Sequence, residues 1–314
     1  MSLVRGSEML EDPNLKIRRV LVFFFILSLL VVGAYALDTP SAFLFALIPL
    51  SYTIPAFIWL DRLEPEPRAM RWNAFLWGGG VAALVAGIAN GVTEVSFGTA
   101  AALVISAPVV EETMKTLGVL GAAKRNQIDT PLDGVVYAGY VGLGFASVEN
   151  VMYFGQAITD GDLGPMFVVR GLLSPFVHPF FTLWAGLAIG KAVKKGSSRK
   201  TAALRGLLLS MALHASWNAA GLNAVFALLL LGHIALFIVV VWRLQRLRHA
   251  EIARVRHHLP KLAFVYNVSP LELEVYGDLR ATQRLRSKLT RKERSAFDAR
   301  RVFITKRALQ EEQV

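Results

Sequence analysis

Apolar segments of about 20 residues follow one another through most of this 314-residue chain. A helix rises about 1.5 Å per residue, so a segment of this length can cross the hydrocarbon core of a bilayer. Eight such segments can be identified, at about 19–37, 41–60, 74–91, 99–121, 132–156, 165–190, 202–221 and 223–243. The pattern predicts an all-α fold: a polytopic membrane helix bundle of about eight transmembrane helices.

The loops between these segments alternate in charge. One set is basic and carries Arg62, Arg68, Arg71, Lys124, Arg125, Lys191, Lys194, Lys195, Arg199 and Lys200. The alternate set contains no Lys or Arg and carries Asp38, Glu94, Asp160 and Asp162. Because Lys and Arg accumulate on the cytoplasmic side of membrane proteins, this alternation predicts that both termini are cytoplasmic.

Composition and charge support a membrane protein. Hydrophobic residues make up 54% of the chain, and it contains no cysteine, which excludes disulfides and thiolate metal sites. The net charge of +11 could suit nucleic acid, but residues 243–314 carry 17 Lys and Arg against 8 Asp and Glu. A basic segment beside a membrane favours anionic lipid headgroups, so no nucleic acid is expected as a partner. We therefore divide the chain into a cytoplasmic segment (1–18), a transmembrane domain (19–245) and a basic cytoplasmic tail (246–314).

Ionisable residues lie deep within four consecutive apolar segments. Each charge at mid-membrane costs roughly 2.5–3.5 kcal/mol on insertion scales, so a chain that carries several must stabilise or use them. They and their polar neighbours are Glu111, Glu112, Lys115, Glu149, Asn150, Arg170, His178, His214 and Asn218. From the helical rise, Glu111, Glu149, His178 and His214 all lie roughly 15–22 Å from the cytoplasmic ends of their segments. We expect them to form one layer near the bilayer centre.

Carboxylates, imidazoles and an amide in one layer suit the activation of water. A carboxylate can take a proton from water, while an imidazole and an amide can hold that water or stabilise an oxyanion. Glu111 and Lys115 are four residues apart, as are His214 and Asn218, so each pair shares a helix face. A metal set of Glu149, His178 and His214 could instead bind zinc and lower the pKa of its bound water to about 7. The residues leave both chemistries open, with no cofactor if the carboxylate alone activates water.

Other interpretations of the same residues remain. Glu111, Glu112 and Lys115 could be a structural ion pair, although two acids exceed what one Lys neutralises. Lys115 is better explained as a charge partner than as a catalyst, and Arg170 could pair with Glu149 or reach toward the interface. A proton- or cation-coupled transporter would use the same Glu/His layer, but the chain shows no pair of matching halves. A scaffold that only displays the basic tail would leave the buried acids unexplained.

Four motifs in order along these segments resemble those of the PrsW family of intramembrane proteases. That family belongs to the superfamily of CAAX prenyl endopeptidases and bacteriocin-processing enzymes. The motifs are Glu111-Glu112-x-x-Lys115, Phe145-x-x-x-Glu149-Asn150, Arg170 with His178 in a Pro/Phe-rich setting, and His214-x-x-x-Asn218. The resemblance covers roughly residues 20–243 and does not extend to the tail.

The resemblance implies an endopeptidase that hydrolyses a peptide bond of a membrane-anchored protein in the bacterial cytoplasmic (inner) membrane. It implies a base region at Glu111 and Glu112, with Glu149 and His178 as partners of water or metal. His214 and Asn218 would stabilise the water or an oxyanion. In the family the known type of substrate is an anti-sigma factor. Members of the superfamily have been classed as glutamic and as metallopeptidases, so zinc stays an open expectation.

Overall fold

The computed structural model describes residues 13–220 and 226–311, and the regular elements among them are helices. This confirms the predicted all-α fold. The elements of the first described range are α1 (Pro13–Tyr35), α2 (Ser41–Leu60), α3 (Arg68–Leu76), η1 (Trp77–Ala82), α4 (Ala83–Phe97), α5 (Thr99–Ala101), η2 (Ala102–Ser106), α6 (Ala107–Lys124), α7 (Pro131–Asp160), α8 (Leu163–Met166), η3 (Phe167–Leu173), α9 (Val177–Lys194) and α10 (Arg199–Ala220). The remaining helices are α11 (Phe226–Tyr266), α12 (Pro270–Tyr276), α13 (Leu279–Lys288) and α14 (Arg291–Gln310).

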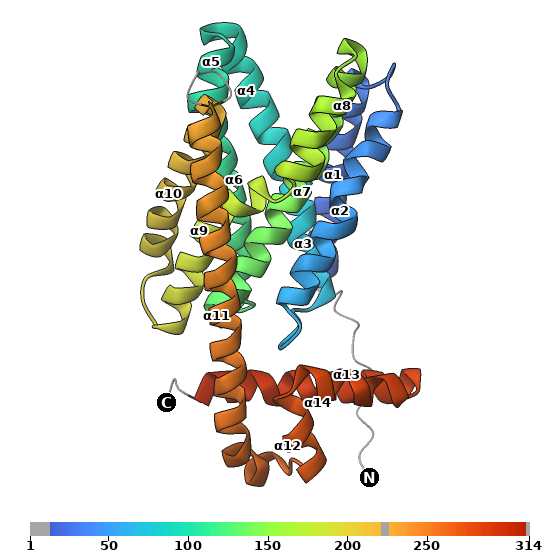
Figure 1. Ribbon diagram of the computed structural model, residues 1–314, viewed down its shortest axis with the longest axis vertical. Coiled ribbons are helices and arrows are strands. Elements are labelled where there is room, and N and C mark those ends of the chain that lie inside the picture. The colour runs from blue at the N-terminus through green and yellow to red at the C-terminus, as the bar shows by residue number, and fades with distance from the viewer. Residues whose placement is uncertain (1–12, 221–225, 312–314) are drawn as a thin grey trace.

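Helix α7 is the centre of the bundle and packs against α9, α2, α3 and α6 (Figure 1). It starts with a capping box, in which Thr130 and Asp133 satisfy each other's backbone N–H groups. Gly142 lets α9 approach closely, because a Cβ there would lie 2.6 Å from the backbone nitrogen of Pro179. The consequence is that the start of α9, including His178, is pressed against the middle of α7.

Five of the described helical segments are long and apolar enough to cross a membrane, which indicates a multi-pass membrane protein. They are Ile17–Ala34, Ser41–Leu60, Arg68–Phe97, Leu163–Lys194 and Leu228–Tyr266. The other three predicted spans coincide with α5–α6, α7 and α10, whose polar residues make them less apolar. The count of eight and the position of the termini therefore stay predictions. The predicted segment 1–18 lies mostly outside the described residues, and so does the boundary between the predicted spans 202–221 and 223–243.

Wide π turns interrupt three of the long helices beside the bundle centre. The turn η1 contains three consecutive glycines, η2 lies just before Pro108, and η3 lies just before Pro175. Proline has no N–H to donate to the preceding turn, so the helix must change its hydrogen-bond pattern there. After η3 the chain leaves the helix at residues 174–176, and α9 starts inside the bundle. Such interruptions are tolerated in membranes where the freed groups face protein or a cavity.

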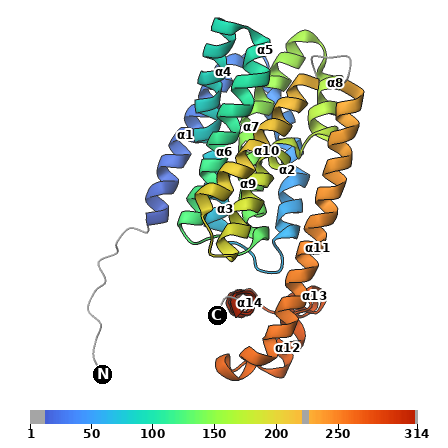
Figure 2. The ribbon, with the colours of Figure 1, turned by 90° about the vertical axis from the view of Figure 1, so that its left-hand side faces the viewer.

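The basic tail folds onto the end of the bundle that carries the basic loops. Helix α11 passes residue 245 without a break and extends beyond the bundle, and α12–α14 gather at its far end (Figure 2). Their buried side chains, among them Val255 and Ile304, form an apolar core that includes Leu63 from the α2–α3 loop. Arg301 donates to the Leu63 carbonyl at 2.6 Å, and Lys306 forms ion pairs with Glu64 and Asp129. The tail therefore has a core of its own, which the sequence did not predict.

Candidate active site

Helix α6 carries the two glutamates and the lysine into the bundle. Lys115 is fully buried, and its Nζ lies 2.6 Å from Glu112 Oε1 and 3.4 Å from Glu111 Oε2. The ammonium also lies 4.3 Å from the centre of the Phe145 ring on α7. These contacts compensate the cost of burying three charges, and they pack α6 against α7.

His214 of α10 is held against Glu112. Its Nδ1 lies 3.0 Å from Glu112 Oε1, and its ring stacks on Phe181 of α9 at a centroid distance of 4.7 Å. The other ring nitrogen, Nε2, lies 4.0 Å from Glu111 Oε2. This distance is too long for a direct hydrogen bond, so the two groups face each other without bonding directly.

His178 of α9 lies between α6 and α7. Its Nε2 lies 2.7 Å from Glu149 Oε2, and its Nδ1 lies 3.2 Å from Lys115 Nζ. An ammonium can only donate, so Nδ1 accepts from Lys115 and Nε2 donates to the carboxylate of Glu149. His178 Nδ1 is also 4.0 Å from Glu111 Oε2, the same distance as His214 Nε2. Both imidazoles therefore face one oxygen of Glu111.

Arg170 closes the other side of the site from η3. Its guanidinium forms an ion pair with Glu149, and its Nε donates to Asn150 Oδ1 at 2.8 Å. The guanidinium also lies 3.7 Å from the centre of the Tyr153 ring. The pairing of Arg170 with Glu149 was one of the two interpretations that the sequence left open. When both imidazoles are neutral, the three carboxylates together with Lys115 and Arg170 have a net charge of −1.

One predicted site residue lies apart from the others. Asn218 follows His214 by one turn of α10, but its Nδ2 donates to the Leu103 carbonyl of η2 at 2.8 Å. Glu111, Glu112, Glu149, His178 and His214 are joined through Lys115 or through direct contacts. The acids and imidazoles from four helices thus meet as expected, whereas the amide of Asn218 is directed to a backbone carbonyl.

Two site contacts come from residues that the sequence analysis did not single out. Thr182 of α9 donates to Glu112 Oε2 at 3.2 Å, and Asn90 of α4 donates to Glu111 Oε1 at 3.2 Å. Thr182 is four residues after His178, so the helical period could have placed it on the same face. Asn90 belongs to none of the four motifs. An amide among apolar residues of a predicted span was the only signal for it.

The donors in the site are of types that bind a metal ion. Glu111, Glu112 and His214 each offer one ligand atom, and these three atoms lie within 4.8 Å of one another. Carboxylate oxygens and an imidazole nitrogen are ligands that zinc accepts. In the predicted set of Glu149, His178 and His214, the two ring nitrogens of His178 face Glu149 and the Lys115 ammonium. The assignment of Glu149 and His178 as ligands remains a prediction.

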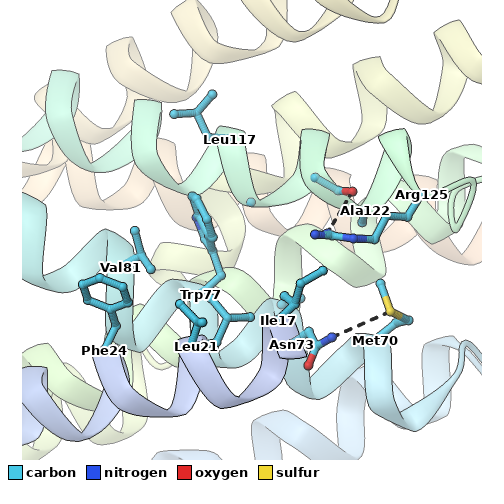
Figure 3. Close-up of a pocket in the computed structure, with 14 residues that line it drawn as sticks. Ile17, Leu21, Phe24, Met70, Asn73, Trp77, Val81, Leu117, Ala122 and Arg125 are labelled. Atoms are coloured by element: carbon cyan, nitrogen blue, oxygen red, sulfur yellow. Dashed lines mark hydrogen bonds between the residues drawn. The ribbon is translucent and has the colours of Figure 1, made fainter. Parts of the chain in front are cut away.

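A groove beside α6 is separate from these residues. It has a volume of about 520 Å³ and lies between α1, the α3–η1 helix and α6, with mostly apolar walls (Figure 3). Leu21, Phe24 and Trp77 line it, and Arg125 lies at one end. Trp77 donates from its indole nitrogen to the Met114 carbonyl at 2.8 Å. None of the polar residues of the site lines this groove, so it is not the active site.

Comparison with known proteins places the site in a family. The chain is similar to protease PrsW of Oceanobacillus iheyensis (30% identity over 125 residues, 39% of this chain and 56% of that protein) and of Geobacillus kaustophilus (31% over 120 residues, 38% and 51%). It is also similar to protease PrsW of Clostridioides difficile (24% over 234 residues, 71% and 94%). The matches to the first two relatives span about half of their length. No solved structure matches the chain.

Residues 66–244 match the sequence model of the family described as "PrsW family intramembrane metalloprotease". This range is more than half of the chain, and it contains all four motifs and every residue of the site described above. The match confirms the resemblance inferred from the motifs. The chain therefore belongs to the PrsW family of intramembrane metalloproteases.

Proposed function

We propose that this chain is an intramembrane endopeptidase that hydrolyses a peptide bond of a membrane-anchored protein. The observation that carries the proposal is the setting of Glu111 Oε2: His178 Nδ1 from α9 and His214 Nε2 from α10 each lie 4.0 Å from it. A water bound here would donate one hydrogen bond to Glu111 Oε2 and the other to His214 Nε2, while His178 Nδ1, which accepts from Lys115, borders the same space. This is the arrangement that general-base catalysis of hydrolysis requires.

In this mechanism Glu111 is the general base. Its carboxylate takes a proton from the bound water, and the hydroxide attacks the carbonyl carbon of the substrate. The Lys115 ammonium acts as a charge partner, because its three N–H groups are directed to Glu111, Glu112 and His178. The C–N bond then breaks, and the proton held by Glu111 passes to the leaving amine, so one water is consumed per bond.

The remaining side chains position these groups. Glu112 fixes His214 through Nδ1, and Glu149 fixes His178 through Nε2. Arg170 neutralises Glu149, and Asn150 in turn holds Arg170. A carboxylate that binds the second ring nitrogen sets the tautomer and the direction of an imidazole. Asn218 would contribute to an oxyanion site only if its amide left the Leu103 carbonyl.

Zinc would fit the donors Glu111, Glu112 and His214 in the same site. Bound there, it would polarise a carbonyl and lower the pKa of a coordinated water to about 7. Lys115 now pairs with both of these carboxylates, so the ammonium and a metal ion would compete for them. His178, held by Glu149, would still face the site from α9.

We further propose eight membrane crossings with both termini in the cytoplasm of a bacterial cell. The alternation of basic and acidic loops supports this orientation. The site would then lie near the bilayer centre, and the folded tail would lie on the cytoplasmic side, where anionic lipid headgroups would contact its exposed arginines. An anti-sigma factor is one candidate for the membrane-anchored substrate.

The test uses the membrane proteins of an expression host as the substrate pool. The full chain and its Glu111→Gln, His178→Gln and His214→Gln variants are produced at equal membrane levels, and new protein N-termini are quantified by mass spectrometry. We expect termini within or next to membrane segments that arise with the wild type and disappear with all three variants. Termini that persist at wild-type level in all three variants would reject the proposal.

A further inference from the structure

Asn90 is a polar residue on α4, a helix that exposes several large apolar side chains. Its neighbours Ile88 and Val92 on α4 are each 63% exposed, whereas Asn90 is partly buried and turned toward α6. A primary amide at membrane depth is costly unless it is hydrogen-bonded, and such residues commonly join helices or serve a site. The contacts of Asn90 show which groups it joins.

Both ends of the Asn90 amide are paired. Its Nδ2 donates to Glu111 Oε1 at 3.2 Å, and its Oδ1 accepts from the Ser106 hydroxyl at 2.8 Å. A carboxylate only accepts, so the amide presents its NH₂ group to Glu111, and the hydroxyl fixes that orientation from the other end. The three residues form a chain from η2 through α4 to α6.

The backbone places Ser106 for this contact. Ser106 is the last residue of the π turn η2 and is 9% exposed. Two residues later Pro108 lacks an N–H group, and Ala107 bonds back to the Ala102 carbonyl, five residues earlier, in the wide pattern. Turns of this kind often occur at functional sites. Here the turn lies between α5 and the start of α6, the helix that carries Glu111 and Glu112.

Because of this contact, the two oxygens of Glu111 have different neighbours. Oε1 is held by Asn90, while Oε2 faces Lys115 at 3.4 Å and both imidazoles at 4.0 Å. Apart from Asn90, the closest polar group to this carboxylate is Lys115, whose main partner is Glu112 at 2.6 Å. Without Asn90 the carboxylate could rotate, and a displacement of about 1 Å can cost roughly a hundredfold in rate.

We propose that Asn90, oriented by Ser106, is a positioning residue that holds Glu111 with one oxygen directed at the reacting water. This rests on the proposed function, in which Glu111 is the general base. Asn90 acts through Glu111 and does not touch the substrate. The inference adds α4 and η2 to a site that the four motifs place on α6, α7, α9 and α10 with η3.

The test measures cleavage kinetics in proteoliposomes, using as substrate one membrane protein found to be cleaved in the host experiment above. Asn90→Leu keeps the size of the side chain and removes the hydrogen bond, and Asn90→Ala removes both. We expect kcat to fall about 10–100-fold in both variants, the range for partners that orient a catalytic group, with KM changed less than about twofold. A packing role would instead be largely restored by Leu.

A second pair of variants isolates the Ser106 hydroxyl. Ser106→Thr and Ser106→Val add the same bulk, and only Thr keeps the hydroxyl, so we expect Thr to retain a kcat several-fold higher than Val. Thr93→Val is the control on α4, because the Thr93 hydroxyl bonds to its own helix at Ala89 and should leave kcat unchanged.

Wild-type kcat in Asn90→Leu, or equal kcat in the two Ser106 variants, would overturn the inference. The Glu111→Gln variant in the same liposomes distinguishes failure of the positioning role from failure of the proposed function. If Glu111→Gln is inactive while Asn90→Leu is fully active, the positioning role fails and the proposed function stands. If Glu111→Gln is itself active, the proposed function fails.

Discussion

His214 and Glu112 are joined across two helices by a hydrogen bond of 3.0 Å between Nδ1 and Oε1. A neutral imidazole that donates through Nδ1 keeps its lone pair on Nε2, which here faces Glu111. Glu112 is also bound by Lys115 and Thr182, so both of its oxygens are occupied. The two adjacent glutamates therefore have different surroundings: both oxygens of Glu112 are bound, whereas Glu111 Oε2 lies 4.0 Å from a nitrogen of each imidazole.

The first prediction separates the two glutamates by stability. Glu112→Gln breaks the shortest ion pair of the buried Lys115, so we expect a loss of about 3–5 kcal/mol and a clearly lower Tm. Glu111→Gln should lower the Tm less, because its contact with Lys115 is longer, at 3.4 Å. Thermal unfolding of the purified proteins in detergent measures both. A larger drop for Glu111→Gln would contradict the assignment.

The second prediction concerns Lys115. Lys115→Met would leave two carboxylates adjacent to each other in an apolar setting, so we expect little folded protein in the membrane. Converting Glu111 and Glu112 to Gln as well should restore folding but not activity, because the unpaired charges are then gone. Lys124→Met, at the exposed end of the same helix, is the matched control. Normal folding of Lys115→Met alone would show that the ion pairs do not hold the site.

The third prediction distinguishes two metal ligand sets. If the grouped atoms of Glu111, Glu112 and His214 bind zinc, Glu111→Gln and His214→Gln should lose it, and His178→Gln should keep it. The set expected from the sequence, Glu149, His178 and His214, predicts loss in His178→Gln and retention in Glu111→Gln. Elemental analysis of protein purified from zinc-supplemented cells decides between them. Metal-free wild-type protein would favour water activated by the carboxylate alone.

The fourth prediction concerns the loop that binds the tail. Burial raises the pKa of Asp61 to about 8, although Arg71 opposes the shift. Burial together with Asp133 also raises the pKa of Glu64, against the opposing charge of Lys306. The folded state then holds protons that the unfolded chain releases above about pH 4, so stability falls as the pH rises toward about 8. We expect the Tm to decrease over this range and Asp61→Asn to flatten the decrease. A Tm that rises with pH in the wild type would contradict this.

The sequence predicted most of the site because its signals were local. Charges within apolar segments are conspicuous, and the helical rise placed Glu111, Glu149, His178 and His214 at one depth. The structure brings these four together as expected. Which atoms pair could not be predicted, since rotation of each helix decides whether His178 meets Glu149 or a metal ion.

Other features had no local signal. Asn90 lies outside the motifs, and its contact with Glu111 depends on how α4 packs against α6. Asn218 shares a helix face with His214, yet a wide turn brings the Leu103 carbonyl to its amide. The tail shows a high density of Arg and Lys, which favours a solvated segment. Its apolar core forms only where the tail helices pack against one another and against Leu63. These are consequences of tertiary packing rather than of sequence periodicity.

The most direct test of the account is the cleavage rate of Glu111→Gln beside the wild type, in identical liposomes and at equal amounts of folded enzyme. Gln keeps the shape of the side chain but cannot take a proton from water. If Glu111 is the base, kcat falls by at least about a hundredfold while the Tm stays near that of the wild type. A variant that cleaves the same substrate at the wild-type rate would contradict the central claim.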